Sequence, residues 1–159
     1  MSTETETSTL PPALEAARAA AQAEGLAYSG GISPQEAWAL FSQSQAVLVD
    51  VRSGEERKFV GHVPDSLHVP WATGTALTRN PRFVRELEAA VTKAAGKDTP
   101  VLLLCRSGKR SILAAEAAVK AGLPLVFNVL EGFEGEIDAQ GHRGVDDGWR
   151  FRGLPWVQD

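Results

Sequence analysis

Apolar residues occur along the chain in two alternating patterns, short and nearly unbroken runs and helix-like repeats. The runs cover residues 46–51, 67–69, 101–104 and 125–130. Short runs that are almost entirely apolar are typical of strands buried on both faces of a parallel sheet. Between them, apolar residues recur three or four positions apart, which predicts helices. Strands that alternate with helices in this way predict an α/β fold with a mainly parallel sheet.

Capping and helix-breaking residues mark where the helices begin and end. Residues 33–36 (Ser-Pro-Gln-Glu) form the pattern of an N-cap, a first-turn proline and a capping-box glutamate. A second helix is expected to open at Asn80-Pro81 and to close near Gly96. A third is expected over residues 111–121, because Gly122 follows it.

The flanks of the chain differ in composition from its middle. Residues 1–10 are rich in Ser, Thr and Glu, which predicts a disordered tail. Residues 11–29 comprise an Ala-rich helix, expected to pack loosely on the main body, and a flexible joint at 28–31. Residues 30–159 form the expected main domain. Its Gly-rich end is expected to fold back on the core through Trp149, Phe151, Leu154 and Trp156.

The chemistry is predicted at Cys105, the only cysteine, which follows the run 101–104 and precedes a helix. Ligands of parallel α/β sheets lie outside the carboxyl ends of the strands. A strand–loop–helix turn directs backbone N–H groups into a hollow at the positive end of the helix, and Gly108 permits such a turn. Arg106, Lys109 and Arg110 add positive charge within five residues of the sulfur. These features favour a nucleophilic thiolate. The alternative is a small core residue at the end of a strand.

Composition and charge indicate which classes of partner and which cellular location to expect. The chain has 159 residues, 43% of them hydrophobic, and a formal net charge of -4, which argues against a nucleic-acid partner. No apolar run reaches the length of a membrane span, and the polar start differs from a signal peptide. One cysteine cannot form an internal disulfide. A cytoplasmic protein without nucleic-acid or membrane partners is therefore expected.

Three blocks of the sequence resemble the rhodanese family. The first comprises residues 48–52 (Leu-Val-Asp-Val-Arg), with Gly-His-Val-Pro-Asp-Ser at 61–66. The second is the loop 105–111 (Cys-Arg-Ser-Gly-Lys-Arg-Ser), and the third is 128–133 (Asn-Val-Leu-Glu-Gly-Phe). The resemblance covers about residues 30–157. It implies a sheet of about five mainly parallel strands flanked by helices, and a thiosulfate sulfurtransferase.

The resemblance also assigns roles to residues. Cys105 would be the catalytic nucleophile, taking sulfur from thiosulfate or a similar anionic donor as a persulfide. Cyanide, a small thiol or a sulfur-accepting protein would then remove the sulfur, with no cofactor or metal. The residues expected to bind the donor are Arg57, Arg106, Ser107, Gly108, Lys109 and Arg110. Those expected to support the site are Asp50, Arg52 and Ser111, with Asp50 and Arg52 interpreted as a structural ion pair rather than as catalytic residues.

Alternatives remain at several positions. Cysteine phosphatases need an arginine six residues after the cysteine, and Ser111 occupies that place here. Arg57 could instead be an exposed residue of a charged helix. The spacing of His62, His68 and His142 fits no recognised metal-ligand pattern. Trp71 and Trp149 are interpreted as core residues, with walls of the pocket as the alternative. A sulfur-relay module with a dedicated protein partner is the second functional hypothesis.

Overall fold

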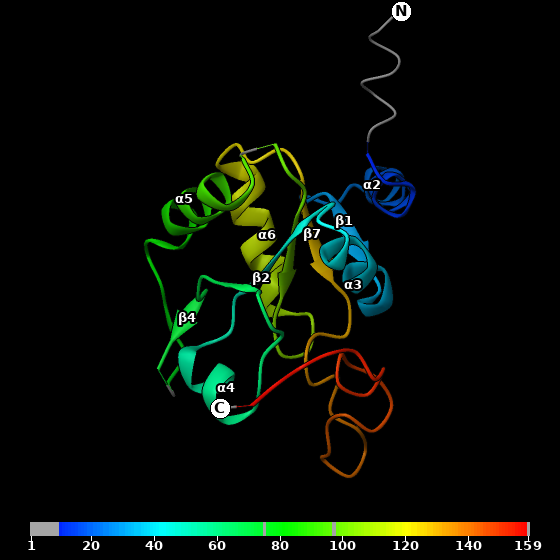
Figure 1. The fold of residues 1–159 in the computed structure, drawn as a ribbon, viewed down its shortest axis with the longest axis vertical. Helices are drawn as coiled ribbons and strands as arrows, with labels where there is room; N and C mark the ends of the chain where they lie inside the picture. Colours follow the sequence, from blue (N-terminus) through cyan, green and yellow to red (C-terminus); the bar gives the residue numbers. More distant parts are fainter. Residues whose placement is uncertain (1–9, 75, 97, 159) are drawn as a thin grey trace, which may run out of the picture.

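The computed structural model describes residues 10–74, 76–96 and 98–158. Its centre is a five-stranded parallel sheet with strand order β1-β7-β6-β2-β3 (Figure 1). The predicted α/β fold with a parallel sheet of five strands is therefore confirmed. The strands are β1 (Gly30–Ile32), β2 (Val47–Asp50), β3 (Leu67–His68), β6 (Val101–Leu104) and β7 (Val126–Val129).

Helices cover both faces of the sheet (Figure 1). On one face lie α2 (Pro12–Glu24) and α3 (Pro34–Ser42), and on the other lie α5 (Phe83–Ala94) and α6 (Arg110–Lys120). Alternate residues of β6 divide between the two cores. Leu102 and Leu104 belong to the core on the α2/α3 side, whereas Leu103 and the following Cys105 belong to the core on the α5/α6 side. The side chain of Cys105 is therefore directed to the α6 side of the central strand.

The helix predicted near the start of the chain is present and is firmly packed. Leu14, Ala17 and Ala21 form its buried face, and Leu14 is completely inaccessible. The expectation of loose packing is therefore wrong. The expected joint at 28–31 is also partly wrong, because Gly30 and Gly31 enter β1 and pair with β7. Gly30 must be glycine there, since a Cβ would lie 2.5 Å from the carbonyl oxygen of Ala17. The predicted tail lies outside the described residues except for Leu10, which packs against the core.

The other predicted boundaries are close to the observed ones. The capping box of α3 is complete, with Ser33 and Glu36 each accepting from the other's backbone N–H. The helix expected from Asn80 begins three residues later, at Phe83, because the Asn80 side chain instead accepts a hydrogen bond from the Arg82 N–H in a turn. The short helix α4 (Gly54–Phe59) carries Arg57, which the sequence allowed to lie on a charged helix. Three strands were not predicted: β1, and the hairpin of β4 (Ala72–Thr73) and β5 (Thr78–Arg79).

The C-terminal stretch folds back on the core mainly through one residue. Trp149 is fully buried on the α3 side, in edge contact with Trp38. The expected return to the core is present, since Leu154 also packs against this core, whereas Phe151 and Trp156 remain partly exposed. A short bridge joins Val157 to His62, which brings the end of the chain beside the segment after α4. No helix in the described part of the chain is long and apolar enough to span a bilayer.

Candidate active site

The candidate site lies at the carboxyl end of the central strand. Cys105 follows β6 directly, and α6 begins five residues later at Arg110. The loop between them turns through Gly108, whose φ of +92° is a conformation that side chains rarely adopt. A Cβ at Gly108 would also lie 3.2 Å from the Glu131 nitrogen in the turn after β7. The backbone conformation and the close contact together explain why this position is a glycine.

The sulfur of Cys105 sits inside a set of hydrogen-bonding groups. The backbone N–H groups of Gly108 and Ser111 donate to Sγ at 3.1 and 3.3 Å. The Ser111 hydroxyl lies 3.2 Å from the same atom. Cys105 is only 1% exposed. A sulfur in contact with two N–H donors at the first turn of a helix is placed where negative charge is stabilised.

A buried side-chain network continues from the sulfur into β7. The Ser111 hydroxyl donates to Oδ1 of Asn128, and Nδ2 of Asn128 donates to the Gly108 carbonyl at 3.1 Å. Both side chains are buried. Ser111 was predicted to support the site, and the structure places it in direct contact with the sulfur. Asn128 was not assigned any role.

The turn after β7 holds the loop from the other side. The N–H of Phe133 donates to the Cys105 carbonyl at 2.7 Å, and the N–H of Glu134 donates to the Arg106 carbonyl at 2.9 Å. At Gly132 the backbones approach so closely that a Cβ would lie 2.5 Å from the Arg106 carbonyl and from the Ser107 nitrogen. The turn therefore fixes the backbone on which the sulfur is carried.

Two of the three cationic residues of the loop are paired with carboxylates rather than directed freely at the sulfur. Arg110 makes a bidentate ion pair with Glu56 of α4, at 2.9 and 2.7 Å. Lys109, an exposed residue, lies 3.6 Å from a carboxylate oxygen of Glu136. Arg106 is half-buried, and its Nε is buried without a hydrogen-bond partner among the described residues. The net positive charge expected around the sulfur is thus largely compensated.

Glu56 is held in its ionised form by these contacts. Burial alone would raise the pKa of its carboxyl, but hydrogen bonds from Arg110 and Ser53 outweigh burial and lower the pKa from 4.5 to about 2. Ser53 and Glu56 form the capping box of α4. The same carboxylate therefore starts one helix and binds the first residue of another.

The charges predicted upstream form a cluster at the end of β2. Asp50 and Arg52 are both completely buried, and two guanidinium nitrogens of Arg52 donate to the carboxylate at 3.0 and 2.8 Å. The predicted structural ion pair is therefore present. Arg57, on α4, donates to the same carboxylate at 3.1 Å and to the Ser66 hydroxyl at 3.1 Å. The structure thus engages Arg57 with protein groups instead of leaving it exposed.

The remaining candidates lie in structural positions. His62 takes part in the bridge to Val157, and His68 hydrogen-bonds the Arg52 carbonyl at 2.8 Å. Within the described ranges no group of three His, Cys, Asp or Glu side chains could hold a metal ion. Trp71 and Trp149 are both buried in the cores, as interpreted from the sequence.

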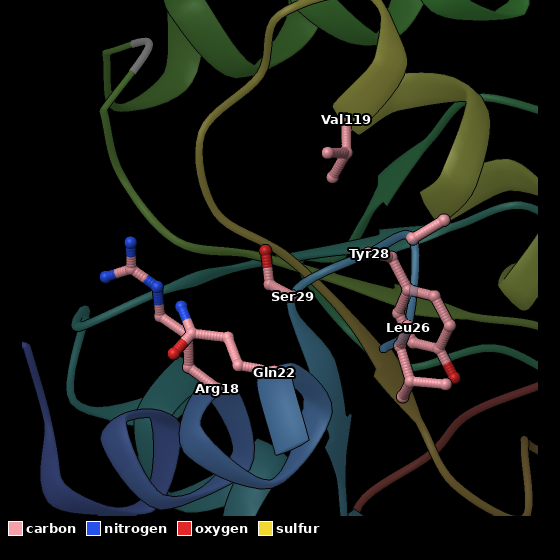
Figure 2. A pocket seen from close by; sticks show the side chains of 7 residues that line it. Arg18, Gln22, Leu26, Tyr28, Ser29 and Val119 are labelled. Carbon is pink, nitrogen blue, oxygen red and sulfur yellow. The ribbon is translucent and has the colours of Figure 1, made fainter. Parts of the chain in front are cut away.

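A pocket lies at the opposite end of the sheet from the sulfur (Figure 2). It has a volume of about 280 Å³ and lies between α2, the start of β1 and the last turn of α6, where Val119 lines it. Cys105 precedes the first turn of that same helix. The length of α6 therefore separates this pocket from the sulfur.

Comparison with known proteins agrees with the fold. Residues 33–137 match the rhodanese-like domain family, and the chain belongs to this family. A crystal structure of Rv0390 from M. tuberculosis is 48% identical, covers 83% of this chain and 99% of its own, and superposes with a TM-score of 0.71.

Two curated relatives extend the comparison. An uncharacterized protein of Rickettsia prowazekii, RP600, is 33% identical over 117 residues, covering 74% of this chain and 87% of its own. The thiosulfate sulfurtransferase GlpE of Actinobacillus pleuropneumoniae is 29% identical over 124 residues, covering 78% of this chain and 89% of its own.

Sequence reasoning missed two residues that contact the loop. Asn128 interrupts an otherwise apolar strand, and a polar residue in such a run signals a buried hydrogen-bond partner. Glu56 follows Ser53 by three residues, which is the spacing of a capping box. That spacing predicts α4, but it gives no indication of the ion pair with Arg110.

Proposed function

We propose that the protein is a sulfurtransferase that carries a sulfane sulfur on Cys105. The observation that carries this proposal is the pair of N–H donors from Gly108 and Ser111 directed at Sγ. Such donors stabilise an anionic sulfur, and the same geometry suits a persulfide at this position. Membership of the rhodanese-like family and the similarity to GlpE support the reaction class.

The proposed reaction proceeds in two displacements. The Cys105 thiolate attacks the outer sulfur of thiosulfate, a sulfur–sulfur bond forms, and sulfite leaves with the electron pair of the broken bond. An acceptor thiolate or cyanide then attacks the outer sulfur of the persulfide, and the thiolate of Cys105 is regenerated. Covalent catalysis of this kind divides one transfer into two easier steps. Neither step requires a general base, provided that the thiol of Cys105 is ionised.

Recruitment of the donor falls to the cations of the loop. Lys109 is the most exposed of them, and its carboxylate partner Glu136 is also exposed, so an anionic donor can compete for it in solvent. Arg110 is bound by two hydrogen bonds to Glu56 and is less available. Since Cys105 is only 1% exposed, the groups that cover the sulfur must move before a donor reaches it.

The burial of the sulfur and the pairing of its cations favour a second candidate function. In a sulfur-relay module, a dedicated protein partner would deliver or remove the sulfur. Docking of that partner would uncover the sulfur, and small donors would react slowly. The two candidates share Cys105 and its persulfide, and they differ in the donor.

Intact-mass spectrometry tests the proposal directly. After incubation with thiosulfate, we expect a gain of about 32 Da, one sulfur atom, that cyanide reverses. Cys105→Ser is the matched control and should gain nothing, because its oxygen cannot form the persulfide. No adduct from either thiosulfate or a small persulfide would contradict a free-standing enzyme. An adduct obtained only from a persulfidated protein would favour the relay module.

A further inference from the structure

Asn128 has a fixed orientation because one end of its side-chain amide contacts a group that can only accept a hydrogen bond. It is 1% exposed and lies in β7, next to the central strand. Its side chain contacts the Gly108 carbonyl oxygen at 3.1 Å, and a carbonyl can only accept a hydrogen bond. The amide nitrogen must therefore face Gly108. Turning the amide over would place two oxygens against each other in a buried site.

This orientation also fixes the hydroxyl of Ser111. With its nitrogen on Gly108, Asn128 presents Oδ1 to Ser111, and that oxygen can only accept. The single hydroxyl proton of Ser111 therefore points to Asn128. What remains toward the sulfur of Cys105, 3.2 Å away, is a lone pair of the hydroxyl oxygen. The hydroxyl of Ser111 therefore forms a hydrogen bond with the sulfur only when the sulfur carries a proton to donate.

We propose that Asn128 is a positioning residue that holds the Ser111 hydroxyl as an acceptor and so stabilises Cys105 as a neutral thiol in the resting protein. The inference rests on the proposed role of Cys105 as nucleophile. Two groups of opposite effect meet at the sulfur. The N–H donors of Gly108 and Ser111 favour the thiolate, and the side-chain network from β7 opposes it.

Ionisation then requires the network to rearrange. When the thiol proton leaves to solvent, the Ser111 hydroxyl must turn toward the anionic sulfur to become a donor. Oδ1 of Asn128 is then left buried without a donor, and such an unsatisfied group is unfavourable. Asn128 thus sets how readily the thiol becomes a nucleophile, without contacting the sulfur itself.

The rate of alkylation of Cys105 by iodoacetamide, without any sulfur donor, tests this inference. In Asn128→Ala, the Ser111 hydroxyl is free to donate to the thiolate, and we expect the rate at pH 7 to rise about three- to tenfold, the effect of one hydrogen bond. The increase should disappear at pH values where the thiol is ionised in every variant. If the substitution only opened the site to the reagent, the increase in rate would remain at those pH values. Ser111→Ala should also raise the rate at pH 7, by less.

A double variant separates positioning from loosening of the core. Because Asn128 acts through the serine, adding Asn128→Ala to Ser111→Ala should change the rate no further. Val126→Ala is the matched control, because Val126 is buried on the same strand, two residues away. An equal increase in Val126→Ala would overturn the inference, and so would an unchanged rate in both Asn128→Ala and Ser111→Ala. If Asn128→Ala does not fold, the alkylation rate of Ser111→Ala at pH 7 becomes the test, and an unchanged rate would overturn the inference. If the alkylation results are as expected but thiosulfate adds no sulfur to Cys105, the proposed sulfurtransferase activity is contradicted and the role of Asn128 is not.

Discussion

Glu56 of α4 accepts two hydrogen bonds from the guanidinium of Arg110 at the first residue of α6. The two residues are 54 positions apart in the chain, and both are largely shielded from solvent. A bidentate pair of this geometry is stronger than an ordinary surface ion pair. The pair connects the segment after β2 to the loop that carries Cys105.

This ion pair predicts how the free energy of unfolding depends on pH. The pKa of Glu56 is lowered from 4.5 to about 2 in the folded protein. Its contribution to stability is therefore fully present above about pH 4.5 and is lost as the pH falls toward 2. A shift of this size corresponds to at most about 3 kcal/mol. Urea unfolding between pH 2 and 7 should show a steeper loss in the native protein than in Glu56→Gln. Glu55→Gln, the same change on an exposed neighbour, should follow the native curve.

The close approach at Gly132 predicts a large effect of one methyl group. Gly132 and Gly25 share a φ of +70°, but only at Gly132 would a Cβ collide with backbone, that of the sulfur-bearing loop. Gly25→Ala should cost about 1 kcal/mol, the usual strain of this conformation. Gly132→Ala should cost at least about 2 kcal/mol more, because backbone must shift. It should also slow persulfide formation. Equal losses of unfolding free energy in the two variants would show that the turn does not constrain the loop.

The buried pair of Asp50 and Arg52 predicts a severe loss on removal of one charge. Asp50→Asn leaves the Arg52 guanidinium buried without its counter-charge, which should lower the free energy of unfolding by about 3–5 kcal/mol. Glu136→Gln, which removes the exposed partner of Lys109, should cost less than about 1 kcal/mol. Chemical denaturation of both variants checks the contrast. A small loss in Asp50→Asn would mean that Arg52 finds other acceptors.

The exposed pair of Lys109 and Glu136 predicts an effect on donor binding. If Lys109 attracts an anionic donor, Lys109→Ala should raise the KM for thiosulfate several-fold and leave kcat nearly unchanged. Glu136→Gln should lower the KM, because it frees the lysine. Both effects should shrink as salt is added. Lys120→Ala removes the same charge from the other end of α6 and should change neither constant. A KM that does not respond to either change would exclude Lys109 from recruitment.

The elements that could be predicted from the sequence are those fixed by local pattern. The apolar run at 101–104 indicated a buried strand, and the residues after it indicated the loop of Cys105. The edge strand β1 was missed because two of its three residues are glycines, which favour turns. The two-residue strands β4 and β5 carry too few positions for a periodic pattern.

At the site, the sequence indicated which groups surround the sulfur but not what they bind. The charges of Lys109 and Arg110 are visible in the chain, whereas their pairing with Glu136 and Glu56 depends on tertiary structure. The same holds for Ser111, whose contact with the sulfur follows from the closing of the loop into a helix.

The burial of Trp149 has a consequence for how the chain can be shortened. The rhodanese-like family match ends at residue 137, yet this indole fills the core beside Trp38 and donates a hydrogen bond to the Pro155 carbonyl. A truncation at the end of the match would leave a hole under α3 and strip apolar surface to water, at a cost of about 3–5 kcal/mol for the tryptophan alone. An expression fragment cut to the family boundaries should therefore aggregate or melt early, and one that ends after Val157 should not.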